Sequence, residues 1–307
     1  MMPLNSAFLR GSFPPLATPF WEAKVDYDKF AELVERQVQQ GSQGIVVTGT
    51  SGEPSSLTIE ERVELFRLAV SVAARRIQVV AATGSQSFVE TAQLTEQAER
   101  AGADAALVVT PYYIKPSQRG LVDYFVALGR RIELPLMIYH IPGRAAVSVK
   151  AQTVMRIAEQ LPHLVGLKHS DGNLELLTEL LVGLGPEFRI FCGVEALSLP
   201  MLILGCSGLM NAAGNLAPAR VAALYAAVQQ RDIERALQIH VELFELNQSI
   251  FIDTNPIPLK YMMWRLGLLD APELRLPLVS LDEAKARILD GVLTRAGLLE
   301  GSRVPAI

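Results

Sequence analysis

Short apolar runs alternate with longer amphipathic segments along most of the chain. The apolar runs are rich in Val, Ile and Leu, which is typical of strands buried on both faces of a sheet. We expect eight strands, at residues 15–18, 44–48, 77–81, 105–109, 136–139, 164–168, 189–192 and 208–211. Helical periodicity follows several of them, at residues 59–74, 88–101, 121–131 and 149–160.

This rhythm predicts an α/β protein. Eight strand–helix units in roughly 230 residues match a (β/α)8 TIM barrel. A doubly wound open sheet is the alternative, but no glycine-rich dinucleotide fingerprint follows the first strand. The pattern beyond residue 230 is mostly helical. We therefore expect a catalytic barrel at residues 1–230 and a C-terminal helical appendage at residues 231–307.

Composition narrows the function classes. The chain has 307 residues, of which 50% are hydrophobic and 20% are charged, and its formal net charge is −4. This balance, without a basic run, argues against a nucleic-acid partner. No apolar run reaches the roughly 18 residues of a membrane span, and the N-terminus lacks a signal-peptide layout. Cys192 and Cys206 show no metal-ligand spacing, so we expect a soluble cytoplasmic protein with reduced cysteines.

Lys168 is notable because it ends a buried strand. It closes the apolar run at residues 164–167 and is followed by polar turn residues. Burial of an ammonium costs free energy and favours the neutral amine. A neutral amine on a rigid strand end is what Schiff-base chemistry with a keto substrate requires. The alternative is a side chain that extends to the rim without a chemical role.

Other polar residues follow the strands at the same end of the barrel, where such barrels carry their active sites. Thr50 and Ser51 lie between two glycines, and their hydroxyls suit a carboxylate. Tyr139 is able to relay protons near a lysine, and Arg144 suits bidentate binding of a carboxylate. Turn, rim and ion-pair roles are the alternatives for each residue alone. Together with Lys168, the set fits an enzyme that forms a Schiff base with a keto acid.

The histidines do not predict a metal site. His140, His163, His169 and His240 lack the spacing of metal ligands. His140 follows Tyr139 directly, so a base at the site is one interpretation and a hydrogen-bonded rim histidine is the other.

These stretches resemble the dihydrodipicolinate synthase / N-acetylneuraminate lyase family of pyruvate-dependent class I aldolases, over about residues 11–298. The synthase branch is the most similar, through the Pro-Tyr-Tyr segment, the arginine after Pro142 and the Asn-Pro-Ile-Pro segment. The resemblance is carried by Gly49-Thr50-Ser51-Gly52-Glu53, Val109-Thr110-Pro111-Tyr112-Tyr113, Tyr139-His140-Ile141-Pro142-Gly143-Arg144, Gly166-Leu167-Lys168 and Asn255-Pro256-Ile257-Pro258-Leu259-Lys260.

The resemblance implies catalytic roles for four residues. Lys168 would form the imine with pyruvate, and Tyr139 would move protons to and from the imine and the enamine. Thr50 would take part in this relay. Tyr113 would complete it from a neighbouring subunit, which implies a homodimer, usually paired into a homotetramer.

It also implies the substrate contacts. Thr50 and Ser51 would bind the pyruvate carboxylate, and the main-chain carbonyl of Met210 would face the bound pyruvate. Arg144 would receive the carboxylate of the second substrate.

The implied reaction is that of a lyase of lysine and diaminopimelate biosynthesis. It joins pyruvate to L-aspartate 4-semialdehyde and gives 4-hydroxy-tetrahydrodipicolinate, without a metal or an organic cofactor. One alternative is a related pyruvate-dependent aldolase or hydratase-aldolase acting on another aldehyde or 2-keto-3-deoxy acid. A non-catalytic barrel that binds a keto acid is another.

Some positions depart from the family pattern. His140 stands where the family usually has asparagine, and Ala145-Ala146 stand where the synthases usually have Thr-Gly. Ile59 and Arg62 occupy positions where lysine-sensitive members place histidines. We therefore expect weak or absent inhibition by lysine.

Overall fold

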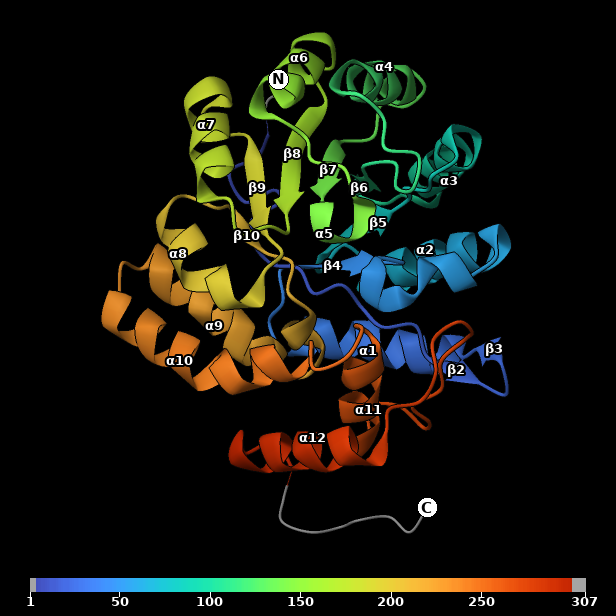
Figure 1. The fold of residues 1–307 in the computed structure, drawn as a ribbon, viewed down its shortest axis with the longest axis vertical. Helices are drawn as coiled ribbons and strands as arrows, with labels where there is room; N and C mark the ends of the chain where they lie inside the picture. Colours follow the sequence, from blue (N-terminus) through green and yellow to red (C-terminus); the bar gives the residue numbers. More distant parts are fainter. Residues whose placement is uncertain (1–3, 300–307) are drawn as a thin grey trace.

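The chain forms a barrel of parallel strands with helices around it (Figure 1). The computed structural model describes residues 4–299. Within these residues, eight strands form one sheet in the order β1-β10-β9-β8-β7-β6-β5-β4. A bridge between Pro15 and Val46 joins the β1 and β4 ends of this sheet and closes the barrel. The predicted fold class is therefore confirmed.

The barrel strands alternate with helices in sequence. A short antiparallel hairpin, β2 (Phe20–Trp21) and β3 (Lys24–Val25), lies outside the barrel. The barrel strands are β1 (Gly11–Ser12), β4 (Gly44–Val47), β5 (Gln78–Ala82), β6 (Ala105–Val109), β7 (Leu136–His140), β8 (Leu164–His169), β9 (Arg189–Cys192) and β10 (Gly208–Leu209).

The prediction of the first strand at residues 15–18 was wrong, because the regular strand lies at Gly11–Ser12. Pro14 and Pro15 have no N–H group, so a continuous ladder cannot run through them. Only a bridge remains at Pro15, where the N–H of Leu16 donates to the carbonyl of Val46 at 2.9 Å.

The helices around the barrel include those expected from periodicity. The expected helices correspond to α2, α3, α4 and α6, and α4 begins earlier than expected because Ser117 caps it. In the part of the chain that the structure describes, no helix is long and apolar enough to cross a membrane. The helices are α1 (Tyr27–Gln39), α2 (Ile59–Ala73), α3 (Phe88–Ala101), α4 (Gln118–Gly129), α5 (Pro142–Ala145), α6 (Ala151–Gln160), α7 (Leu174–Leu184), α8 (Ser198–Ile203), α9 (Pro218–Gln229), α10 (Ile233–Ser249), α11 (Ile257–Arg265) and α12 (Glu283–Arg295).

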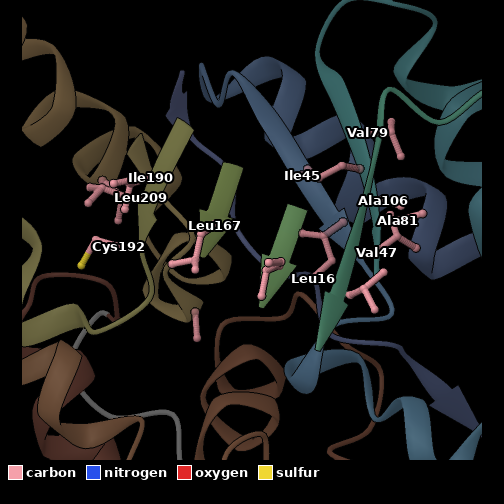
Figure 2. Close-up of a cluster of buried hydrophobic side chains, with 14 of the residues drawn as sticks. Leu16, Ile45, Val47, Val79, Ala81, Ala106, Leu167, Ile190, Cys192 and Leu209 are labelled. Carbon is pink, nitrogen blue, oxygen red and sulfur yellow. The ribbon is translucent and has the colours of Figure 1, made fainter. Parts of the chain in front are cut away.

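Successive side chains of each strand point to opposite faces of the sheet. One set packs against the helices, and Figure 2 shows part of this layer, including Ile45, Val47 and Leu167. The other set fills the barrel interior and includes Val46 and Tyr139. Neighbouring residues at a strand end therefore serve different sides of the sheet.

The C-terminal helices pack beside the barrel. Helix α10 contacts α9, and α12 contacts both α10 and α11 (Figure 1). Helical structure after residue 231 agrees with the sequence pattern, and the domain boundary at residue 231 stays a prediction. Residues 1–3 and 300–307 of the two expected domains lie outside the described residues.

Candidate active site

A cavity of about 50 Å³ lies at the C-terminal ends of the barrel strands. It opens beside a larger cleft of about 790 Å³, and Thr50, Tyr139 and Arg144 line both. The predicted site residues that line the smaller cavity are Thr50, Ser51, Tyr139, Arg144, Lys168 and Met210. Strand ends that are far apart in sequence thus meet where the barrel fold predicts.

Lys168 is held inside the barrel against Tyr139. The two residues are register partners on β8 and β7, and the Lys168 Nζ lies 4.4 Å from the centre of the Tyr139 ring. The side chain of Lys168 is buried. Gly193 makes room for it, since a Cβ at that position would lie 2.6 Å from the Lys168 Cε.

The hydroxyl of Tyr139 faces the loop after β4. Thr50 begins the 3₁₀ turn Thr50–Gly52, and its Oγ1 lies 3.4 Å from the Tyr139 hydroxyl. Both groups donate and accept hydrogen bonds. A threonine hydroxyl, a phenol and a lysine side chain are thus neighbours in space. Such a row of groups is suited to moving a proton to or from a lysine-bound substrate.

Asn255, on the loop before α11, connects the two groups expected to bind carboxylates. Its side-chain Nδ2 donates to the Ser51 Oγ at 3.1 Å, and its main-chain carbonyl accepts from Arg144 at 3.2 Å. Asn255 belongs to a segment that carries the family resemblance, but no role was predicted for it. Its position in that segment was the available signal.

A buried ion pair anchors the Thr50–Gly52 turn. Glu53 has a left-handed backbone with φ of 54°, and its Oε1 accepts from the Lys260 Nζ at 2.8 Å. Both side chains are fully buried. Burial lowers the pKa of Lys260, and the charge of Glu53 opposes that effect. The turn is therefore fixed to α11, a contact that sequence reasoning missed.

Glu195 also belongs to the site, although no sequence pattern predicted it. It lies in the wall of the small cavity, and its Oε1 accepts from the N–H of Ala212 at 2.7 Å. Burial raises the pKa of Glu195. Its position after β9 was the only sequence signal.

His140 does not line the cavity. It follows Tyr139 on β7, so it lies on the opposite face of the sheet. It is buried, and its two ring nitrogens lie 3.0 Å from the His169 Nδ1 and 3.2 Å from the Ser148 Oγ. Burial lowers the pKa of His140 to about 4. The hydrogen-bonded interpretation therefore fits, although the residue is buried behind the sheet rather than at the rim.

Tyr113 lies outside both cavities. Its side chain is 84% exposed, and its backbone is left-handed with φ of 70°. The single chain does not bring it to Lys168, and its expected role in a neighbouring subunit stays a prediction.

The larger cleft contains Ile59 and Arg62, the two residues expected to weaken inhibition by lysine. Arg62, on α2, is buried, and one of its guanidinium nitrogens donates to the carbonyl of Ala82 at 2.9 Å. Another lies 3.5 Å from a carboxylate oxygen of Glu90. Burial lowers the pKa of Arg62 to about 10, so it remains charged at neutral pH. Ile59 and Tyr112 line the same cleft.

Comparisons with known proteins find close relatives over nearly the whole chain. The sequence model of the dihydrodipicolinate synthetase family matches residues 8–296. The 4-hydroxy-tetrahydrodipicolinate synthase of Thermus thermophilus is 43% identical over 94% of this chain and 97% of its own length. The dihydrodipicolinate synthase structure from Aquifex aeolicus has 38% identity and a TM-score of 0.93, covering 95% of this chain and 100% of that one. The Acinetobacter baumannii synthase, solved in complex with pyruvate, has 34% identity and a TM-score of 0.91, with coverage of 95% and 100%.

Proposed function

The chain belongs to the dihydrodipicolinate synthetase family, and we propose that it condenses pyruvate with L-aspartate 4-semialdehyde to give 4-hydroxy-tetrahydrodipicolinate. The observation that carries this proposal is the cluster of Lys168, Tyr139 and Thr50 in one cavity. The curated relatives are named for this synthase, and one solved relative is a pyruvate complex. We infer a cytoplasmic enzyme of lysine and diaminopimelate biosynthesis.

The chemistry begins at Lys168. Its amine attacks the keto carbon of pyruvate, and loss of water leaves a protonated imine. The iminium accepts the electron pair released when a methyl proton leaves, which gives an enamine. The enamine carbon attacks the aldehyde carbon of the second substrate. The amino group of that substrate then attacks the imine carbon, which closes the ring and releases Lys168.

Each proton transfer needs a group that both donates and accepts. Tyr139 lies against Lys168 and near Thr50, which supports a role for its hydroxyl in protonating the departing oxygen and in taking up protons later. Thr50 and Ser51 would hold the pyruvate carboxylate, with the carbonyl of Met210 beside the bound substrate. These groups complete the scheme without a metal or an organic cofactor.

Arg144 provides the test of the second substrate. Its contact with Asn255 uses one of five guanidinium N–H groups, so a carboxylate can bind the remaining ones. We expect Arg144→Ala to lower kcat/KM for aspartate semialdehyde by about 10- to 100-fold, the value of a charge-assisted hydrogen bond. Steady-state assays should compare this substrate with an aldehyde that lacks a carboxylate, whose turnover should change little.

The control for Arg144→Ala is borohydride trapping of pyruvate alone, which should match that of the wild type. An unchanged kcat/KM for aspartate semialdehyde would contradict the assignment. A related aldolase acting on another aldehyde would then be favoured.

We further propose a homo-oligomer in which Tyr113 reaches the cavity of a neighbouring subunit. Tyr113 and the adjacent Ile114 are exposed, as expected of residues that a partner covers. A second exposed apolar surface runs along α10, and a homotetramer would use both surfaces. The apolar residues of this α10 surface recur at helical spacing and are Ile233, Leu237, Val241 and Phe244.

Lysine is expected to be a weak inhibitor or none. Arg62 keeps a positive charge in the larger cleft, and Ile59 offers no hydrogen bond to an amino group. A cationic ligand would be repelled at short range. A steady-state titration with L-lysine should show no strong inhibition at sub-millimolar concentration. Arg62→His is the matched variant and should be more sensitive, whereas strong inhibition of the wild type would refute this expectation.

A further inference from the structure

Two pairs of residues face each other across the ends of β7 and β8. Tyr139 is the register partner of Lys168, and His140 is the register partner of His169. Because side chains alternate along a strand, the first pair lies in the barrel and the second lies behind it. The two histidine rings are stacked, with centres 5.2 Å apart and an interplanar angle of 14°.

The hydrogen bonds assign a proton to each ring. The Nε2 of His169 lies 2.9 Å from the carbonyl of Asn173, which only accepts, so this nitrogen carries a proton. The Nδ1 of a neutral His169 is then an acceptor. The Nδ1 of His140, 3.0 Å away, must donate to it, and the Nε2 of His140 accepts from Ser148.

Both rings are suited to the neutral state. Burial lowers the pKa of His140 and of His169, and Asp171 is the only charged side chain among residues 4–299 that bears on both, where it opposes the effect. A proton added to the Nδ1 of His169 would set two N–H donors face to face. The hydrogen bonds from Ser148 through both rings to Asn173 therefore all point in the same donor-to-acceptor direction.

We propose that the His140–His169 hydrogen bond positions Tyr139 against Lys168. This inference rests on the proposed function, which makes those two residues the catalytic pair. The bond joins the same two strand ends on the face away from the cavity. Main-chain bonds continue the connection, since the carbonyl of His140 accepts from Ser170 at 2.9 Å and that of His169 from Gly193 at 2.8 Å.

The two end members of this hydrogen-bond series, Ser148 and Asn173, lie on elements around the barrel. Ser148 lies on the segment before α6, and Asn173 caps α7 through bonds to Glu175 and Leu176 at 3.0 and 3.2 Å. The two rings thus tie β7 and β8 to the elements around the barrel. A displacement of the β7 end relative to the β8 end would require this series of hydrogen bonds to break, so we name His140 and His169 positioning residues.

His140→Leu tests the proposal by removing the hydrogen bond while keeping a side chain of comparable size. We expect kcat to fall by about 10- to 100-fold, because small misplacements of reacting groups have effects of this size. The KM for pyruvate should stay within about threefold, because the carboxylate pocket is on other loops. The rate of borohydride trapping at Lys168 should fall in proportion to kcat. His140→Asn should recover most of the activity, since its amide N–H can replace the donor.

His163→Asn is the matched control. His163 precedes the opposite end of β8, and burial also lowers its pKa. Its kcat should be that of the wild type. A folded His140→Leu with unchanged kcat, or an equal loss in His163→Asn, would overturn the proposal. Wild-type trapping is measured first, because its absence would instead contradict the proposed function.

A spectrum of the wild type tests the same bond without any substitution, in case His140→Leu fails to fold. Long-range ¹H–¹⁵N NMR at neutral pH should show a proton on the Nδ1 of His140 and on the Nε2 of His169. Protons on the Nε2 of both rings, or two charged rings, would overturn the proposal.

Discussion

Lys168→Ala should abolish condensation, with kcat reduced by at least about 10⁴-fold, because the covalent intermediate can no longer form. Nothing else in the small cavity offers an amine, among the residues that the structure describes. Intact mass after borohydride reduction with pyruvate should show one adduct in the wild type and none in the variant. Peptide mapping should place the wild-type adduct on Lys168.

Lys150→Ala is the control for that substitution. Lys150 is exposed before α6 and outside both cavities, so its removal should leave the adduct and kcat unchanged. An adduct that persists in Lys168→Ala would show that another amine reacts. Absence of an adduct in the folded wild type would favour a barrel that binds a keto acid without catalysis.

Tyr139→Phe should lower kcat by about 10²- to 10⁴-fold, the range of general acid–base catalysis. The phenylalanine ring would still pack against Lys168, so the change removes the hydroxyl and little else. Imine formation and loss of the methyl proton should both slow. The rate of borohydride trapping measures the first step, and hydrogen–deuterium exchange at the pyruvate methyl measures the second.

Tyr124→Phe provides a matched comparison. The Tyr124 hydroxyl also bonds to a threonine, Thr91, at 2.9 Å, but it lies outside the cavity. This variant should retain wild-type kcat. If Tyr139→Phe also stays within about threefold of the wild type, the relay must use another group, and Glu195 in the cavity wall would be the first to test.

The strand ends that form the candidate site were predictable because the signal is local. Lys168 and Tyr139 each end an apolar run, and the barrel fold brings such ends together. The first strand was misplaced because an apolar run containing Pro14 and Pro15 resembles a strand in hydrophobicity but lacks the N–H groups for a ladder. The alternation of side chains along a strand predicts the face of the sheet on which His140 lies, but it does not predict that His169 on β8 is its hydrogen-bond partner.

Contacts between distant segments were beyond local patterns. Glu53 and Lys260 are 207 positions apart, and neither has a neighbouring residue that indicates the other. Asn255 likewise contacts Ser51 from a loop that periodicity assigned to no element. A buried pair of opposite charges depends on burial of both partners, and burial at such positions is set by the complete fold.

The Glu53–Lys260 pair has a consequence for the order in which the enzyme becomes competent during synthesis. The ribosome releases β4 and its following turn early, but the lysine that fixes the turn emerges late, with α11. Until then, Glu53 lacks its counter-ion and the turn that it follows lacks its anchor to α11. We therefore expect a growing chain to begin consuming pyruvate only after its C-terminal helices have been made.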